Sequence, residues 1–298
     1  MSEWAFLSAT GLLGRALGPA PKPQAGPLSG RAPHDVVASA AAFFAGSVGA
    51  LTNRGRALRL AKEQTCELPA AEGPVSLAAG QPAETLLALE ASERLVALFS
   101  LDPDAPALAI GTAAGVAKRV VPDYKGWDTW EMIALKDGDE VTGAAPSADA
   151  DELVFITSDA QLLRCPARSV RPQGRQAGGM AGVNLAPAAR VLAFAAIRRE
   201  DKATALVTTV AGGPDPADQI EWAVKTTPFE AFPAKGRATG GVRCHRFLKG
   251  QAVLRLAWAG PGPALACDRD GQPRNLPPAD PRRDASGAPL AARLFAIG

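Results

Sequence analysis

The chain has 298 residues, and its 32 Lys and Arg nearly balance its 30 Asp and Glu, which gives a formal net charge of +2. A hydrophobic fraction of 47% excludes a disordered chain, and the 30 Gly and 26 Pro argue against a helical bundle because both residues destabilise helix interiors. The near-neutral total gives by itself no sign of a nucleic-acid partner.

A short unit recurs along the chain: an apolar run, a Ser or Thr, a turn, a second apolar pair and a basic residue. In the four clearest copies an Arg follows seven residues after the Ser or Thr, and the turn holds Gly in three copies and Ala160 in the fourth. Gly supplies the positive φ of a tight turn, so each copy predicts a β-hairpin. The four copies span residues 4–15, 48–59, 108–119 and 153–164.

Two weaker copies extend the series to six starts, near residues 4, 48, 108, 153, 205 and 253. Their spacing of roughly 50 residues is typical of propeller blades and solenoid units. Further strand-like runs follow the hairpins, so that one unit offers about four short strands, which bury both sheet faces only when units pack radially. These runs cover residues 84–101, 130–143, 182–197 and 289–297.

We therefore predict an all-β, six-bladed ring of four-stranded blades that forms one domain over residues 1–298. The tail, 286–298, reads as half a unit and the head, 3–15, as its missing partner, so the two would pair and close the ring. A sandwich of unrelated hairpins is the alternative.

The small net charge hides an asymmetry. Residues 1–150 hold 12 basic and 17 acidic side chains, a balance of −5, whereas residues 151–298 hold 20 and 13, a balance of +7. Two stretches, 160–199 and 231–267, contain seven and six basic residues and no acid, and each has a Gly-rich centre. Gly lets a backbone approach a phosphate and Arg supplies bidentate donors, so these stretches predict contact with a nucleic-acid backbone. Solvated loop arginines are the alternative.

On these features the chain resembles the C-terminal domain of the A subunit of bacterial type IIA topoisomerases, DNA gyrase and topoisomerase IV. The resemblance lies in the Thr-x-x-Gly-x-x-x-Arg hairpins, their period, and the Arg/Gly segments 170–184 and 232–243. It covers essentially the whole chain and implies a six-bladed β-pinwheel, a propeller-like disc whose basic rim bends duplex DNA.

The resemblance assigns the DNA contacts to two groups of cations. The first follows the hairpins and would ring the rim, and the second lies in and around the Arg/Gly segments. The first comprises Arg15, Arg59, Lys118, Arg119, Arg164 and Lys225, and the second Arg168, Arg171, Arg175, Lys235, Arg237, Arg243 and Arg246.

One departure bears on the kind of topoisomerase. Gyrases of this family carry a Gln-Arg-Arg-Gly-Gly-Lys-Gly box in the first blade, but residues 21–35 here read PKPQAGPLSGRAPHD. Residues 173–179 keep three of its seven positions. The departure favours a topoisomerase IV-like subunit over a gyrase-like one.

Catalytic motifs are missing from the sequence. There is no GxxxxGK[ST] loop, GxSxG elbow or HExxH motif, and the single Tyr, Tyr124, does not follow an Arg as the family's cleavage tyrosine does. The four Cys show no CxxC pair and only two His, His34 and His245, are available, which argues against a zinc site. We therefore expect no cofactor and no catalysis on this chain alone.

The expected partners are duplex DNA, the ATPase B subunit of the topoisomerase, which supplies the energy, and the rest of the A subunit, with the isolated domain a monomer. No apolar run approaches the roughly 18 residues of a membrane helix, and the sparse Cys fit a reducing compartment. We expect a cytoplasmic, nucleoid-associated domain without membrane contact. The competing hypothesis is a propeller-type protein-interaction module that does not bind DNA.

Overall fold

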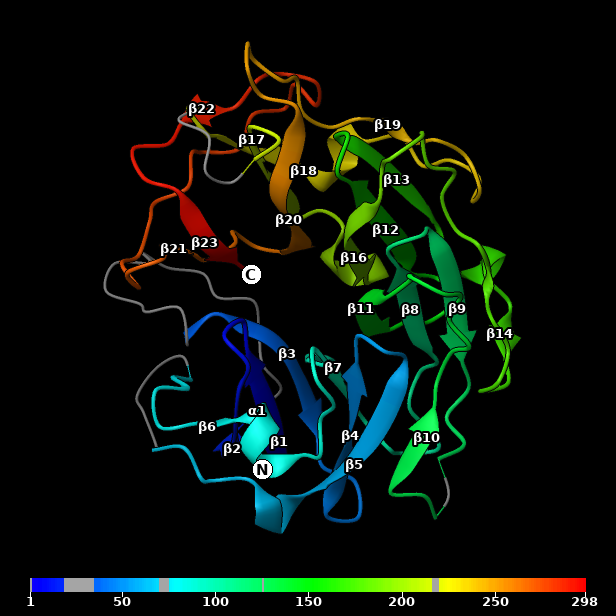
Figure 1. Cartoon of the computed structure of the whole chain (residues 1–298). Coiled ribbons are helices and arrows are strands. Elements are labelled where there is room, and N and C mark those ends of the chain that lie inside the picture. The colour runs from blue at the N-terminus through cyan, green and yellow to red at the C-terminus, as the bar shows by residue number, and fades with distance from the viewer. Residues whose placement is uncertain (1, 19–34, 70–74, 125, 216–219) are drawn as a thin grey trace.

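The structure is a computed structural model that describes residues 2–18, 35–69, 75–124, 126–215 and 220–298. Its regular secondary structure is mainly short strands, nearly all paired antiparallel, which form small sheets around a ring (Figure 1). The one α-helix of the described residues, α1 (Ala83–Leu86), has a single turn, and no helix there is long and apolar enough to cross a membrane.

Five units each begin with the predicted β-hairpin, which forms the middle of a sheet. Apolar residues dominate these strands, and most of their side chains are buried or half-buried. The hairpins are β1 (Ser2–Ser8) with β2 (Leu12–Gly18), β4 (Ser47–Thr52) with β5 (Arg56–Ala61), β8 (Leu108–Thr112) with β9 (Val116–Val120), β12 (Glu152–Thr157) with β13 (Gln161–Pro166), and β17 (Ala205–Gly212) with β18 (Ala223–Pro228).

The recurring Ser or Thr has a local structural role at the hairpin turn. The hydroxyls of Ser8, Thr112 and Thr157 each accept the backbone N–H four residues later, at 2.9, 3.2 and 3.0 Å. The turn residue then takes a positive φ, and Ala160 does so at 61° in the copy that lacks Gly. The sequence pattern of a hydroxyl residue, a turn residue with positive φ and an apolar second strand therefore marks the hairpin turn directly.

The third strand of each unit pairs with the first and lies on the inner side of its sheet, towards the middle of the ring (Figure 1). Neighbouring inner strands contact one another in chain order, and their apolar side chains join the sheets into continuous cores. These strands are β3 (Val37–Ala42), β7 (Leu95–Phe99), β11 (Val141–Pro146), β16 (Val191–Ile197) and β20 (Val253–Pro261).

The outer strand of each sheet comes from the next unit. The segment between the second and third strands of a unit, here called its crossover, runs back to the preceding sheet and pairs with that sheet's second strand. The exchanged strands are two or three residues long and lie at the outer edge in Figure 1. They are β6 (Gln81–Pro82), β10 (Thr129–Glu131), β14 (Pro172–Gln173) with β15 (Met180–Ala181), β19 (Val242–Arg243) and β22 (Ala288–Pro289).

The prediction of six complete blades is wrong. The described residues form five sheets of four or five strands and a sixth sheet of only two, β21 (Ala266–Asp268) and β23 (Leu294–Ile297). The run starting at Val253 is β20, the inner strand of the fifth sheet, and not the start of a sixth hairpin. The fold remains a propeller-like ring of small antiparallel sheets.

The sequence of the sixth unit explains its incomplete sheet. A hairpin begins at β21, where Arg274 N–H bonds Ala266 O at 2.8 Å and Cys267 bridges Pro273. It stops there, since Pro273, Pro277 and Pro278 lack the N–H groups that a second strand would need. The sixth unit therefore gives β22 to the fifth sheet but offers no second strand of its own.

Head and tail do not pair as predicted. Within the described residues β1 pairs with β2 and β3, and β23 pairs with β21. The last residue still meets the first unit, because a Cβ added at Gly298 would lie 2.8 Å from Val36 Cγ1. Side-chain packing, and no shared sheet, joins the two ends there.

Candidate nucleic-acid interface

The two Arg/Gly segments, far apart in the sequence, lie side by side in the structure. Arg237 of the fifth crossover donates from Nη1 to Ala181 O at 2.8 Å and from Nε to Ser169 O at 3.1 Å, both in the fourth crossover. Backbone contacts continue the seam: Ala238 N–H bonds Gly182 O, and Asn184 N–H bonds Thr239 O. The predicted phosphate-binding segments therefore form one continuous outer surface.

A third basic crossover extends this surface. Arg246 N–H bonds Ala285 O at 3.1 Å, which places the segment between β21 and β23, here called the sixth crossover, beside the fifth. That crossover carries Arg282, which pairs with Asp280, and Arg283. Sequence reasoning missed both arginines because Asp280 and Asp284 flank them and they lie outside the acid-free stretches.

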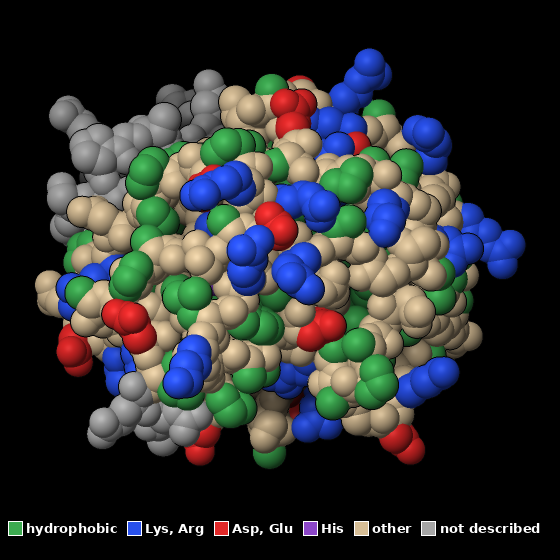
Figure 2. All heavy atoms as spheres, turned by 90° about the horizontal axis from the view of Figure 1, so that it is seen from above, with side chains coloured by type: hydrophobic (Ala, Val, Ile, Leu, Met, Phe, Trp, Pro, Cys, Tyr) green, Lys and Arg blue, Asp and Glu red, His purple; other side chains and the backbone are tan. Residues whose placement is uncertain are grey.

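We call the resulting surface the basic edge. Its cations come from the crossovers of the fourth, fifth and sixth units, and all are exposed or half-buried. Figure 2, seen from above Figure 1, shows Lys and Arg spread over this side of the molecule with fewer Asp and Glu between them. The basic edge comprises Arg168, Arg171, Arg175, Lys235, Arg237, Arg243, Arg246, Arg282 and Arg283.

Arg175 is held by an aromatic ring at the start of the basic edge. Its guanidinium carbon lies 3.6 Å from the ring centroid of Trp127, whose own side chain is 41% exposed. Arg59 in turn donates from Nε to Trp127 O at 3.0 Å and from Nη2 to Tyr124 O at 2.8 Å. Stacking restricts the rotamers of Arg175 and leaves its N–H groups able to donate.

Three cations predicted on the rim are instead buried. Lys118, Arg119 and Lys225 are 0%, 3% and 3% exposed. Arg119 donates to Ser147 O at 3.1 Å and pairs with Asp149 at 2.6 Å. Side chains this enclosed cannot reach a phosphate without rearrangement, so the structure corrects their assignment to the surface of the rim.

The other three post-hairpin arginines are half-buried and already have partners. Arg15 pairs with Glu3 at 2.6 Å, and Arg164 lies 3.3 Å from Glu152 and 4.6 Å from the Phe229 ring centroid. Arg59 binds the two carbonyls named above and lies 5.9 Å from the Trp130 centroid. Arg15 also donates to Thr65 O and Arg164 to Phe229 O, so each of the three arginines joins its hairpin to a neighbouring crossover and is first a structural residue.

The histidine and the tyrosine that the sequence offered as reactive side chains, His245 and Tyr124, are buried in the protein. His245 is 1% exposed, with Nδ1 2.9 Å from Thr209 Oγ1 and Nε2 accepting the N–H of Gly287. Burial, followed by the nearby charge of Lys225, lowers the His245 pKa to about 4. Tyr124 is 5% exposed and burial raises its pKa. Among the described residues no group of three His, Cys, Asp or Glu could hold a metal ion.

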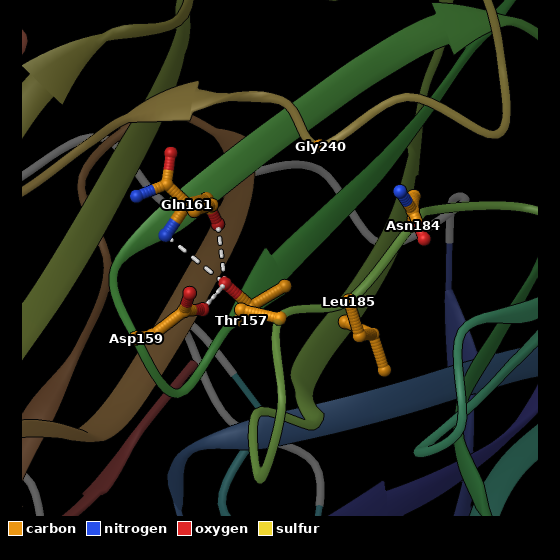
Figure 3. A pocket seen from close by; sticks show the side chains of 7 residues that line it. Thr157, Asp159, Gln161, Asn184, Leu185 and Gly240 are labelled. Atoms are coloured by element: carbon orange, nitrogen blue, oxygen red, sulfur yellow. Dashed lines mark hydrogen bonds between the residues drawn. The ribbon is translucent and has the colours of Figure 1, made fainter.

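A hollow of about 360 Å³ opens beside the hairpin turn of the fourth unit (Figure 3). Thr157 and Gln161 line one side and Asn184 and Leu185 the other. A smaller hollow lies at the equivalent turn of the third unit, beside Thr112. Because the feature repeats with the hairpin, it is part of the repeat architecture.

Parts of this chain are similar in sequence to the A subunit of DNA gyrase. The family model described as "DNA gyrase C-terminal domain, beta-propeller" matches residues 151–198 and 224–254, within the units that carry most of the basic edge. The A subunit of DNA gyrase from Mycobacterium leprae is 29% identical over 198 residues, which are 64% of this chain and 14% of that protein. The Escherichia coli protein is 28% identical over 170 residues, 55% of this chain and 18% of that protein. The chain thus spans about a seventh to a fifth of these two relatives.

Solved structures share the fold over the whole chain. A C-terminal domain of DNA topoisomerase IV superposes with a TM-score of 0.74 at 15% identity, covering 100% of this chain and 93% of that one. A DNA gyrase A C-terminal domain does so with a TM-score of 0.64 at 16% identity, covering 100% and 99%.

Proposed function

Because this chain belongs to the C-terminal domain family of type IIA topoisomerase A subunits, and is not their catalytic region, we propose that it binds duplex DNA along the basic edge. The observation that carries the proposal is the union of three crossovers, distant in sequence, into one surface rich in arginine. Phosphate contacts of this kind position a duplex without reading its sequence.

The distribution of charged residues over the crossovers favours DNA contact with only part of the disc. The crossover of the second unit carries Glu67 and that of the third carries Asp123, Asp128 and Glu131, whereas the basic edge belongs to the last three units. A duplex would therefore follow an arc over the fourth to sixth crossovers. Such an arc bends or orients DNA with less contact than a complete wrap requires.

The test is a salt titration of duplex affinity with two double variants. Arg171→Ala with Arg243→Ala removes two exposed members of the basic edge, and Arg54→Ala with Lys136→Ala removes two exposed cations of the second and third units. We expect the first pair to weaken binding to all sequences and to reduce the salt slope by about one unit per lost contact, and the control pair to change neither. A wild-type domain with no duplex affinity, or with affinity independent of salt, refutes the proposal and leaves the protein-interaction module.

We further propose that the domain serves a topoisomerase IV-like subunit, where it acts with an ATPase B subunit, which supplies the energy, and with the remainder of the A subunit in the cytoplasm, at the nucleoid. The absence of the seven-residue box from residues 21–35 supports this, although most of that segment lies outside the described residues. Sealing nicked circular DNA with the domain bound separates the two classes. A change in linking number contradicts the topoisomerase IV-like assignment and favours a gyrase-like one.

A further inference from the structure

Two buried lysines occupy the same place in two different sheets. Lys118 pairs with Ile110, and the register of that first strand shifts two residues later, at Thr112. Lys225 pairs with Thr209, and the register of its first strand also shifts two residues later, at Ala211. Both are in the second strand of a hairpin, and both side chains are buried, at 0% and 3% exposure.

Each ammonium group binds the backbone of crossovers and no carboxylate within the described residues. Lys118 Nζ donates to Met132 O and Ala177 O, both at 2.7 Å, and to Arg175 O. Its three N–H groups therefore have three carbonyl acceptors. Lys225 Nζ donates to Arg282 O at 3.0 Å and to Arg283 O.

Three of the carbonyls that these lysines bind belong to residues of the basic edge, namely Arg175, Arg282 and Arg283. Lys118 fixes the backbone at Arg175 itself and ties it to Met132, which follows β10 in the third crossover. Lys225 fixes the backbone of Arg282 and Arg283 in the sixth crossover. Each buried lysine thus binds the backbone of a loop whose arginine side chains are exposed or half-buried.

The sheets do not need a lysine at this position. Leu58 and Leu163 stand there in the second and fourth sheets, opposite Ala50 and Phe155, and are buried among apolar neighbours. Burial lowers the pKa of Lys118 and of Lys225 to about 8, and a buried leucine carries no charge that must be taken out of water. The lysines occur under two crossovers that present basic-edge arginines.

We propose that Lys118 and Lys225 are positioning residues for DNA binding: each fixes a crossover so that Arg175, or Arg282 and Arg283, face the phosphates. The inference rests on the proposed function, since it needs the basic edge to contact DNA. Neither lysine touches DNA, and each acts through the arginines of the loop that it holds.

The first experiment needs no DNA. Hydrogen exchange is followed in wild type, Lys118→Met, Lys225→Met and the control Leu163→Met, together with the thermal midpoint. We expect exchange at 174–178 in Lys118→Met, and at 281–285 in Lys225→Met, to rise about tenfold or more while the hairpin strands stay protected. Unchanged exchange in both loops overturns the inference. If Lys118→Met fails to fold, Lys225→Met gives the same test at a separate crossover.

The second experiment measures duplex affinity and its salt slope at a temperature where each variant is folded. Each Lys→Met change is expected to weaken binding roughly fivefold to tenfold and to lower the salt slope, with Leu163→Met unchanged. Lys118→Met combined with Arg175→Ala should bind no worse than the weaker single variant, because both act through one contact. A purely structural lysine would leave the slope of the folded protein unchanged, and additive effects would likewise overturn the inference.

The two proposals fail differently. If wild type does not bind duplex DNA, the proposed function fails whatever the loops do. If wild type binds and the lysine variants keep its affinity and slope, only the positioning role fails.

Discussion

The guanidinium of Arg175 stacks on the indole of Trp127, with 3.6 Å between the guanidinium carbon and the ring centroid. The two residues come from the crossovers of different units, and Lys118 joins the same two crossovers from the interior through Met132 O and Arg175 O. This part of the basic edge is therefore held from both sides before any ligand arrives.

The stack should contribute to DNA affinity. Replacing Trp127 with Leu removes the platform, so Arg175 gains rotamer freedom that binding must again restrict. We expect duplex affinity to fall by about twofold to fivefold, which corresponds to the ~0.5–1 kcal/mol of an exposed cation–π contact. Fluorescence anisotropy at fixed salt measures it. Phe44→Leu, an exposed aromatic of the first unit, is the control, and equal losses in both variants would contradict a specific role for the stack.

Arg15 should matter for stability and little for DNA. It pairs with Glu3 and donates from Nε to Thr65 O at 3.2 Å, so Arg15→Ala leaves a half-buried carboxylate with one partner fewer. We expect the free energy of unfolding to fall by about 1–2 kcal/mol and the salt slope of DNA binding to stay constant. Arg243→Ala, at an exposed site, should lower the salt slope of DNA binding and leave the free energy of unfolding unchanged. Chemical denaturation and a salt titration of both variants decide it, and a lower slope in Arg15→Ala would return that residue to the DNA surface.

Replacing glycine with alanine at two hairpin turns should lower the stability of the domain by different amounts. Gly11 and Gly115 both have a φ of 83°, but a Cβ at Gly11 meets nothing within 4 Å while one at Gly115 would lie 2.8 Å from Val183 O. Gly11→Ala should cost about 1 kcal/mol, from the backbone conformation alone. Gly115→Ala should cost clearly more because the neighbouring crossover must move. Equal losses in thermal or denaturant unfolding would show that the contact with Val183 is not rigid.

Acid should destabilise the domain through His245. In the folded state its pKa is lowered from 6.5 to about 4 by burial and by Lys225, so between those values the unfolded chain binds a proton that the folded chain does not. The stabilisation is fully present above pH 6.5 and is lost as the pH falls towards 4, by up to roughly 3 kcal/mol. Unfolding free energies measured from pH 7 to 4 should fall more steeply in wild type than in His245→Gln. Parallel curves would contradict the assignment.

The hairpins could be read from the sequence because their signals are local. Hydroxyl, left-handed turn residue and second strand lie within about ten residues of one another, and Ser8 and Thr112 show the same turn contact in separate units. The Arg/Gly segments were also visible, although their union along the Arg237 seam was not.

The exchanged strands could not be read from the sequence. β14 and β19 have two residues each, too few for an alternating pattern, and they are strands only because β9 and β13 offer an unpaired edge. The apolar run of β20 looks like the start of a hairpin, and only its pairing with β17 assigns it to the fifth unit. Likewise, nothing local distinguishes the buried Lys118 from a rim cation, since its acceptors lie up to 59 residues away.

Strand exchange means that no unit of the chain is a complete module. Each of the five larger sheets receives its outer strand from the unit that follows, as β18 receives β22 from the proline-rich sixth unit. A chain that ended just after β20 would keep five hairpins but leave β18 with an open edge and Lys225 without its carbonyls. The two-stranded sixth unit thus supplies a strand to its neighbour and, within the described residues, receives none.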